Sequence, residues 1–280
     1  MTFKISLTAI ALSLMLGSPA AAACATDVQV SAFVADYISN TPTGALSVGG
    51  TMDDALCSQA KLSTALTSHM GPVIGYKAGL TSTPAQERFG VSEPVRGLLY
   101  RDMMLLDGAV VPAAFGARPL FESDMILVVG NNAINQATTT QEVMAQVSAI
   151  HPFIELPDLT LAPDQPITAV TLTAMGVGPK LGVLGAAIDP SGLHDALAEM
   201  TVTITASDGE VLAKAHGAAV LGHPANSVLW LMSKGVVMKP GDLISVGSFG
   251  PLLPPAKAKG TATVTYSGLP GDPTVSVTFE

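Results

Sequence analysis

One stretch of the chain decides its fold: Phe121-Glu122-Ser123-Asp124-Met125-Ile126-Leu127. The dense apolar run from Met125 to Val129 predicts a buried strand, and two acidic residues lead into it. Residues i and i+2 of a strand point to the same face, so Glu122 and Asp124 should lie side by side. Two carboxylates on one buried face repel each other unless a cation lies between them. The spacing alone leaves two interpretations open, a metal site or a pair of solvated surface charges.

A third acidic residue stands in apolar surroundings further along, in Ile154-Glu155-Leu156. Three carboxylates offer only oxygen ligands, which suit a hard divalent ion, Mg²⁺ first and Mn²⁺ or Ca²⁺ next. The chain has no cluster of Cys and His residues that would hold zinc. The sequence therefore points to an oxygen-ligated ion if these three carboxylates converge.

Lys77 is a lone charge within the apolar segment from Gly75 to Leu80. A buried lysine is costly unless it is paired, and a depressed pKa makes it a usable acid or base. The alternative is a stem that lies on the core while the ammonium stays in water. Both interpretations of Lys77 stay open on composition alone.

Capping signals and hydrophobic periodicity place the elements around these residues. Helices are expected from Thr51, which opens a capping box, to the stop at Gly71, and in a short segment with a second capping box at Thr83 that ends at Gly90. Further expected helices cover 139–150 and 223–234. Strands are expected at 72–80, 125–129, 201–206, 243–246, 260–266 and 274–279. These elements predict an α+β fold, with a smaller helical N-terminal part at 24–106 and a β-rich metal-binding body at 107–280.

The N-terminus reads as a cleavable secretory signal peptide over residues 1–23. Lys4 is followed by an apolar run from Ile5 to Leu16, and small residues at 20–23 offer a cleavage site. We therefore expect a periplasmic or secreted protein. Lipidation of Cys24 is the weaker alternative, because Ala21 stands where a lipobox would have Leu.

Composition limits the partners and leaves the cysteines undecided. A formal net charge of −9 with few charged residues argues against nucleic acid as a partner. No segment after the signal peptide is both long and apolar enough to cross a membrane. In an oxidising compartment Cys24 and Cys57 could form a disulfide, whereas cleavage after Ala25 would remove Cys24 and leave Cys57 as a small buried side chain.

Several motifs in order resemble the 2-keto-4-pentenoate hydratase family, a branch of the fumarylacetoacetate hydrolase superfamily with the 4-oxalocrotonate decarboxylases as near relatives. The resemblance extends from about Thr51 to the C-terminus, and several ordered motifs are more specific than any one of them. The motifs are Gly75-Tyr76-Lys77-Ala78-Gly79-Leu80-Thr81-Ser82, Phe89-Gly90-Val91-Ser92-Glu93-Pro94, Pro119-Leu120-Phe121-Glu122-Ser123-Asp124, His151-Pro152-Phe153-Ile154-Glu155-Leu156, Leu221-Gly222-His223-Pro224-Ala225-Asn226 and Val246-Gly247-Ser248-Phe249.

This resemblance implies a mixed β-roll fold and a hydratase, a lyase acting on a small 2-oxo or 2-hydroxydienoic acid through a metal-stabilised enolate. The predicted signal peptide, and not the resemblance, makes it an exported one. It implies Mg²⁺ or Mn²⁺ as cofactor and a homo-oligomer as the assembly. Carried over residue by residue, the metal ligands are Glu122, Asp124 and Glu155, and the catalytic lysine is Lys77. We also assign Leu80 and Ser248 to substrate binding, since Ser248, between Gly247 and Phe249, could offer a hydroxyl and backbone N–H groups to an anion. Asp124 departs from the Glu that is usual in the family and is one methylene shorter.

Two other departures affect the reaction rather than the ion. The family often has an Asp after the position of Pro94, where this chain has Val95 and Arg96. It also often has an Asp-Asn pair in the region that Ala169-Val170-Thr171 fills here. A fumarylacetoacetate-type C–C hydrolase and a non-catalytic oxo-acid-binding relative therefore remain as alternatives.

Overall fold

The computed structural model describes residues 24–280, so the predicted signal peptide at 1–23 lies outside the described residues. Within this range no helix combines the length and the apolarity that crossing a membrane requires. The α-helices are α1 (Asp27–Ile38), α2 (Met52–Met70), α3 (Thr83–Phe89), α4 (Thr140–Met144), α5 (Ala169–Ala174), α6 (His194–Glu199) and α7 (Asn226–Ser233). Short 3-10 turns are η1 (Arg101–Met103), η2 (Asn132–Gln136), η3 (Gly217–Ala219) and η4 (Pro255–Ala258).

The strands form two mixed sheets, which together with the helices confirm the predicted α+β class. In spatial order, one sheet consists of β2 (Val95–Tyr100), β1 (Val73–Gly79), β10 (Leu243–Ser245), β5 (Glu122–Val129), β6 (Val147–Leu156), β7 (Leu181–Leu184) and β3 (Met104–Leu106). The other consists of β4 (Ala109–Val111), β12 (Thr274–Phe279), β11 (Thr261–Ser267), β8 (Thr201–Ala206) and β9 (Val211–His216). The pairs β1–β10, β3–β7 and β4–β12 are parallel, and the other neighbours are antiparallel.

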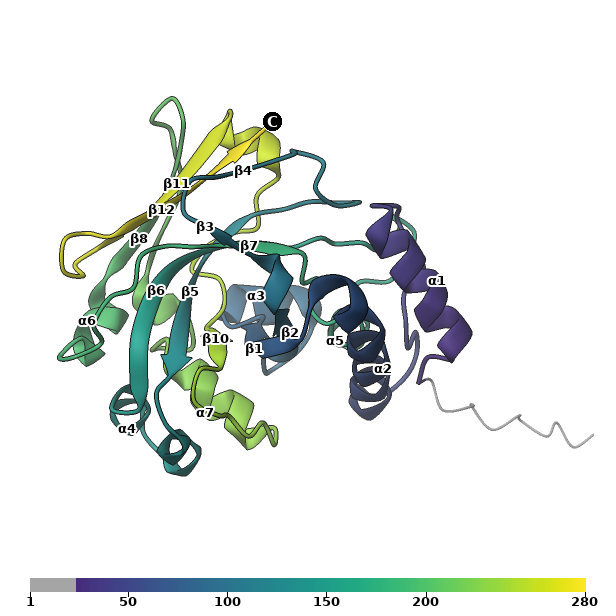
Figure 1. Ribbon diagram of the computed structural model, residues 1–280, viewed down its shortest axis with the longest axis horizontal. Coiled ribbons are helices and arrows are strands. Elements are labelled where there is room, and N and C mark those ends of the chain that lie inside the picture. The colour runs from purple at the N-terminus through teal and green to yellow at the C-terminus, as the bar shows by residue number, and fades with distance from the viewer. Residues whose placement is uncertain (1–23) are drawn as a thin grey trace, which may run out of the picture.

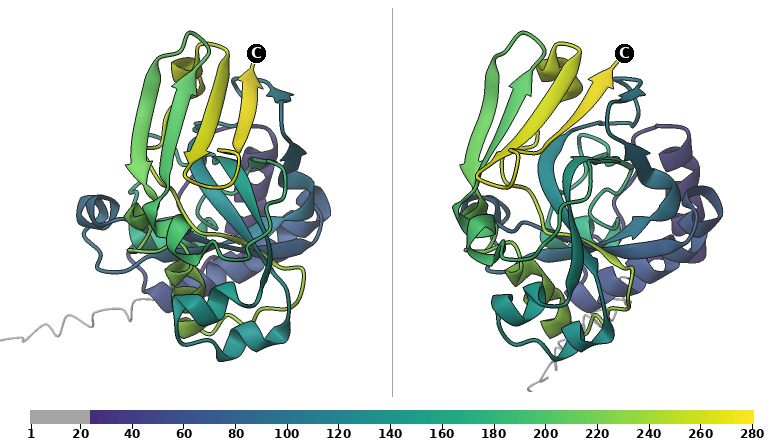
Figure 2. Two further views of the ribbon diagram at one scale, coloured as in Figure 1. Left: turned by 90° about the vertical axis from the view of Figure 1, so that its left-hand side faces the viewer. Right: turned by 60° about the vertical axis from the view of Figure 1, so that its left-hand side comes forward.

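The five-stranded sheet and the two N-terminal helices lie at opposite ends of the molecule (Figure 1). Figure 2 shows the green and yellow strands of the five-stranded sheet side by side as one layer. A large apolar core lies where the two sheets meet, and a second core lies beneath α1 and α2. The longer sheet takes β1, β2 and β3 from residues 24–106 and its other strands from 107–280, so the two predicted regions share one sheet.

Two helix predictions need correction. The capping box of Thr139 and Glu142 opens α4 as expected, but the helix ends at Met144 and not at Ile150. Residues from Val147 onward belong to β6 and pair with β5, because tertiary strand pairing outweighs the local helical pattern. The predicted helix at 223–234 begins at Asn226.

The second predicted capping box is also wrong. The residue that caps α3 is Ser82 rather than Thr83, and it makes no side-chain cap hydrogen bond. Gln86, expected to complete the box, instead donates to the carbonyl of Leu80 at 3.0 Å. Gly90 ends the helix with a left-handed conformation, as predicted.

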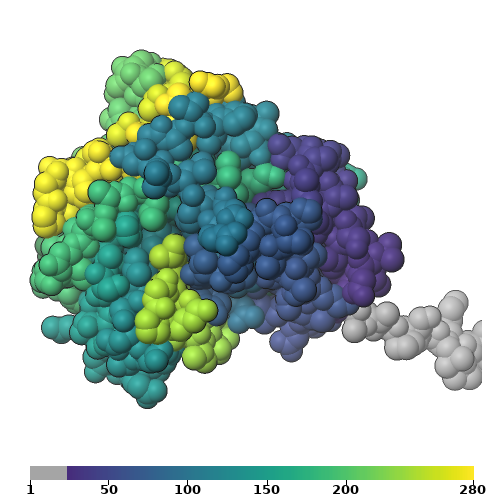
Figure 3. Space-filling model, in the orientation of Figure 1, coloured from purple at the N-terminus to yellow at the C-terminus, as the bar shows by residue number. Residues whose placement is uncertain are grey.

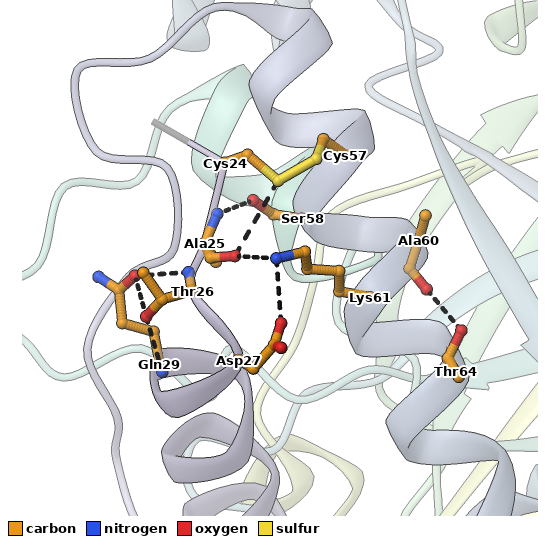
Figure 4. Close-up of polar contacts among 10 residues, drawn as sticks. All are labelled: Cys24, Ala25, Thr26, Asp27, Gln29, Cys57, Ser58, Ala60, Lys61 and Thr64. Atoms are coloured by element: carbon orange, nitrogen blue, oxygen red, sulfur yellow. Dashed lines mark hydrogen bonds and ion pairs between the residues drawn. A yellow bond between two sulfur atoms is a disulfide. The ribbon is translucent and has the colours of Figure 1, made fainter. Parts of the chain in front are cut away.

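The first described residues are fastened to α2. Cys24 and Cys57 form a disulfide, so the open question about these cysteines is answered in favour of the bond. The Ala25 N–H donates to Ser58 Oγ at 2.7 Å, and Lys61 Nζ donates to the Ala25 carbonyl at 3.0 Å (Figure 4). Ala25 is only 2% exposed, so the segment is part of the core and not a loose extension.

Reducing this disulfide is expected to lower the free energy of unfolding by about 3–4 kcal/mol, because the cross-link closes a long loop in the unfolded chain. The two cysteines are 33 positions apart. Urea unfolding with and without a reductant measures the difference, and the Cys57→Ser variant should match the reduced wild type. Equal stability of the oxidised and reduced forms would contradict the prediction.

Candidate metal and catalytic site

Strand pairing between β5 and β6 brings the three predicted carboxylates together. Glu122 and Glu155 are direct partners in the antiparallel ladder, and Asp124 stands two residues further along β5. One oxygen from each carboxylate lies within 4.8 Å of an oxygen of each of the other two. Asp124 and Glu155 are buried as whole residues, and the carboxylate of Glu122 is buried as well, although the rest of that residue keeps partial exposure. The sequence context had suggested that Glu155 follows a helix, but Glu155 lies inside strand β6.

Asp124 is held in place by β10 and the turn that follows it. Ser245 Oγ donates to Asp124 Oδ2, and the backbone N–H of Gly247 donates to Oδ1 at 3.0 Å. The N–H of Met125 lies 2.5 Å from the same Oδ1 atom. These donors fix the direction of the shorter Asp side chain and leave its remaining lone pairs for a further ligand.

A buried tyrosine from the five-stranded sheet braces the two strands that carry the carboxylates. The Tyr266 hydroxyl contacts the backbone carbonyl of Asp124 and that of Phe153, the latter at 3.1 Å. It also accepts a hydrogen bond from the Phe153 N–H at 3.2 Å. Tyr266 thus joins β5 to β6 at the level of the site, and its own burial is complete.

Lys77 enters the site from β1 and is buried, with a side chain that is 3% exposed. This excludes the alternative in which the ammonium stays in water. Lys77 Nζ forms an ion pair with Glu155 Oε1 and donates to the Val177 carbonyl at 3.0 Å. Val177 has φ of +60°, which is uncommon for a β-branched residue, and it stands between Gly176 and Gly178, whose φ values are also positive. This left-handed turn aims the Val177 carbonyl at the ammonium.

The two predicted substrate-binding residues lie at one edge of the site. Because β1 and β10 are parallel, Leu80 after β1 and Ser248 after β10 leave the sheet at the same edge. The turns meet there, since a Cβ on Gly247 would lie 2.4 Å from Thr81 Oγ1. Ser248 Oγ donates to the Gly250 carbonyl at 2.7 Å. Contact of Leu80 and Ser248 with a substrate stays a prediction.

The charges of the site call for a divalent cation. Three carboxylates face one ammonium, and the oxygen-only ligand set suits a hard ion. Burial, followed by the charge of Glu155, raises the pKa of Glu122 well above its ordinary value. The same two causes raise the pKa of Asp124 to about 7, although the Ser245 hydrogen bond opposes them. A divalent ion would reverse both shifts, because it stabilises the charged carboxylates.

These raised pKa values predict that the metal-free protein loses stability as pH rises and that bound metal offsets this loss. Without metal, the folded state holds protons on Glu122 and Asp124 that the unfolded state has already lost, so its stability should fall as pH rises from about 4 to 7. The stabilisation by a metal should instead grow over the same range, since the ion must displace those protons, by up to about tenfold in affinity per pH unit for each proton. Thermal unfolding with EDTA and with Mn²⁺ tests both slopes. Parallel slopes would contradict the prediction, and Asp124→Asn should flatten both.

Three residues that contribute to the site were not predicted from the sequence, namely Ser245, Val177 and Tyr266. Ser245 had a usable signal, as a hydroxyl residue inside an otherwise apolar predicted strand. Val177 stands in a Gly-Val-Gly run that marks an unusual turn. Tyr266 lies on the inward face of an alternating strand, where an aromatic residue is ordinarily read as core.

Comparison with known proteins supports the same picture. The fumarylacetoacetate (FAA) hydrolase C-terminal family matches residues 92–270. A 2-keto-4-pentenoate hydratase from Paraburkholderia xenovorans is 33% identical over 207 residues, covering 72% of this chain and 76% of that protein. This agrees with the resemblance inferred from the motifs.

Solved structures confirm the predicted fold of the fumarylacetoacetate hydrolase type. A 4-oxalocrotonate decarboxylase from Pseudomonas putida G7, complexed with magnesium and adipate, superimposes with a TM-score of 0.80 at 23% identity, covering 91% of this chain and 97% of that chain. The same decarboxylase complexed with calcium and acetate gives 0.78 at 23% identity, with 91% and 96% covered. Structural neighbours thus contain divalent metals, in agreement with the ligand set described above.

Proposed function

Because this chain belongs to the fumarylacetoacetate hydrolase family, we propose that it is a divalent-metal-dependent hydratase acting on a small 2-oxo or 2-hydroxydienoic acid. The observation that carries the proposal is the convergence of Glu122, Asp124 and Glu155 beside the buried Lys77. The similarity to hydratases over most of the chain supports a carbon–oxygen lyase. We propose Mg²⁺ as the resident ion, with Mn²⁺ as a substitute.

The three carboxylates would hold the ion, which when bound supplies a Lewis acid for the oxygens of a 2-oxo acid. Lys77 Nζ would hold the proton that moves between the enol and keto forms of the substrate. The Val177 carbonyl and Glu155 orient that ammonium. Ser245 and Gly247 keep the Asp124 carboxylate directed into the site. The turns at Leu80 and Ser248 would form the edge of the pocket that holds the substrate.

The test is an assay of 2-hydroxypenta-2,4-dienoate hydration with Mg²⁺, followed by analysis of the products. A hydroxylated 2-oxo acid supports the hydratase. Release of carbon dioxide from a 2-oxo dicarboxylic acid would indicate a decarboxylase instead, and two smaller acids from a C–C substrate would indicate a hydrolase. Each of these last two results would overturn the proposed reaction, although all three reactions need the same kind of site.

A second candidate is a non-catalytic binder of oxo acids, and the surroundings of Lys77 favour it. A Cβ on Gly79 would lie 2.8 Å from Val177 Cγ1 and 3.3 Å from Val95 Cγ2, so two valines cover this part of β1. The site therefore has an apolar wall here in place of a second acid–base group. Calorimetry that finds oxo-acid binding without turnover would support the binder, and measurable turnover would exclude it.

We also propose that the chain is exported and is cut between Ala23 and Cys24. Disulfides persist in oxidising compartments, and a cut after Ala25 would remove Cys24 together with the buried Ala25 backbone contacts. A lipid anchor would require the same sulfur atom that Cys24 shares with Cys57.

The expected product of processing is a chain that starts at Cys24, without lipid, and two hydrogen atoms lighter than its reduced form. Intact mass spectrometry of protein recovered from the periplasm or medium of an expressing bacterium measures this. A chain that starts after Ala25, or an acylated chain, would contradict the prediction.

We further propose that the protein forms a homo-oligomer. The exposed apolar side chains of Leu106 and Val110 would be available for its interface. Light scattering gives the mass of the assembly.

A further inference from the structure

The hairpin of β1 and β2 has a second face with its own polar side chains, opposite to the face that carries Lys77. In the ladder Lys77 is paired with Gly97, whereas Tyr76 is paired with Leu98 and Ala78 with Arg96. Because side chains alternate along a strand, Tyr76, Arg96 and Leu98 share the face that turns away from the carboxylates.

A groove of about 470 Å³ opens on this second face. It runs between α2, the β1–β2 hairpin and the loop that follows α7, and the yellow-green atoms of that loop border the blue atoms of the N-terminal part in Figure 3. The residues that matter for its chemistry are Gln59, Ser63, Tyr76, Arg96, Leu98 and Val237.

Arg96 is the unusual member of this lining. Its Nε atom is buried without a hydrogen-bond partner, and within residues 24–280 its guanidinium forms no ion pair. A partly buried charge without a partner is costly, and guanidinium groups fit carboxylates through two parallel hydrogen bonds. Burial, followed by the charge of the acidic residue Asp242, raises the pKa of the neighbouring Tyr76, but Asp242 forms no ion pair with Arg96. The Asp242 Oδ2 atom accepts a hydrogen bond from the Lys239 N–H at 2.9 Å.

The remaining lining adds apolar surface next to this cation. Leu98 and Val237 are both exposed to the groove, and Val237 is 76% exposed overall. The Tyr76 side chain adds a ring and a hydroxyl, and α2 contributes the polar side chains of Gln59 and Ser63. A ligand that fits has one anionic end and one apolar end.

We propose that this groove binds a small organic carboxylate, with its carboxylate on the Arg96 guanidinium and its apolar body against Leu98 and Val237. The site is separate from the carboxylate cluster, because β1 and β2 lie between them. Since Tyr76 and Lys77 are adjacent on β1, a ligand here contacts the strand that carries the catalytic lysine.

The test uses benzoate as the probe and the full mature chain, with Mg²⁺ and excess oxalate present to occupy the metal site. We expect saturable binding by calorimetry, weakened at least about tenfold by Arg96→Gln, since charge-assisted hydrogen bonds are lost. Arg96→Lys should weaken binding less, because it keeps the charge but not the two-pronged geometry. Arg88→Gln, which removes an exposed arginine of α3, should bind benzoate as the wild type does.

Three binding results would overturn the proposal. They are an absence of saturable benzoate binding while oxalate fills the metal site, equal binding by Arg96→Gln and wild type, and a preference for inorganic phosphate over benzoate. A stability measurement separates a structural role from a binding role. Without ligand, Arg96→Gln should unfold at the same temperature as the wild type or a higher one, whereas a marked loss of stability would show that Arg96 has a structural partner, which also overturns the proposal.

Discussion

Lys77→Met is expected to lower kcat by at least about 100-fold, the lower end of what a positioned acid–base group contributes. The substitution keeps most of the side-chain volume and removes only the ammonium, which is the one basic group that contacts the carboxylate cluster in residues 24–280. Steady-state kinetics with Mg²⁺ and a 2-hydroxydienoate measure the effect. Metal affinity should rise or stay the same, because the ion no longer competes with Lys77 for Glu155.

Lys180→Met provides the matched control. Lys180 packs over the ring of Tyr37 and donates to its carbonyl, away from the carboxylates. This variant should keep the wild-type rate. If Lys77→Met turned over as fast as Lys180→Met while binding metal normally, Lys77 would have no part in the chemistry and the proposed site would lose its proton donor.

Glu155→Gln is expected to weaken Mn²⁺ binding by more than about 100-fold, beyond the 10–100-fold that loss of an outer-shell partner causes. Glu155 contributes a carboxylate that is both a direct ladder partner of Glu122 and the acceptor for Lys77. Its amide analogue cannot balance the charge of a divalent ion, and it deprives the ammonium of its counter-charge. Calorimetric titration of the metal-free protein with Mn²⁺ measures the affinity.

Glu199→Gln is the control, because the substitution removes the same charge from the chain. Glu199 is exposed at the end of α6. It should bind Mn²⁺ as the wild type does. Wild-type affinity in Glu155→Gln would show that the ion, if any, lies elsewhere. Comparison with Lys77→Met separates the ligand effect from the loss of the ion pair, since of these two variants Glu155→Gln alone should weaken metal binding.

The sequence was sufficient to identify the carboxylates but not their pairing. Alternation along one strand placed Glu122 and Asp124 on one face, and apolar neighbours marked Glu155 as buried. Their convergence depends on the register of β5 against β6, in which Glu122 meets Glu155. That register is set by contacts across the sheet, and no local pattern in either strand determines it.

The same limit explains the helix that ends early. The signals that open α4 are local, a Thr and a Glu three residues apart, and they were read correctly. Nothing local ends it, because Val143, Val147 and Ile150 also fit a helical spacing. Val147 and Ile150 pair with β5 and therefore belong to the sheet. Tyr266 and Ser245 escaped prediction for a related reason, since they reach the site only when distant strands have docked.

The parallel pairing of β1 with β10 has a consequence for the order in which the molecule assembles. The strand that carries Lys77 is made early in synthesis, yet its inner neighbour contains Ser245, near the end of the chain. Such pairing between distant segments makes folding slow, because a long loop must close before the contact stabilises anything. Until then β1 has only β2 beside it, and its other edge is open to wrong partners. A nascent chain truncated before Leu243 would lack the strand that completes the carboxylate site, so the proposed catalytic centre forms only after nearly the whole polypeptide exists.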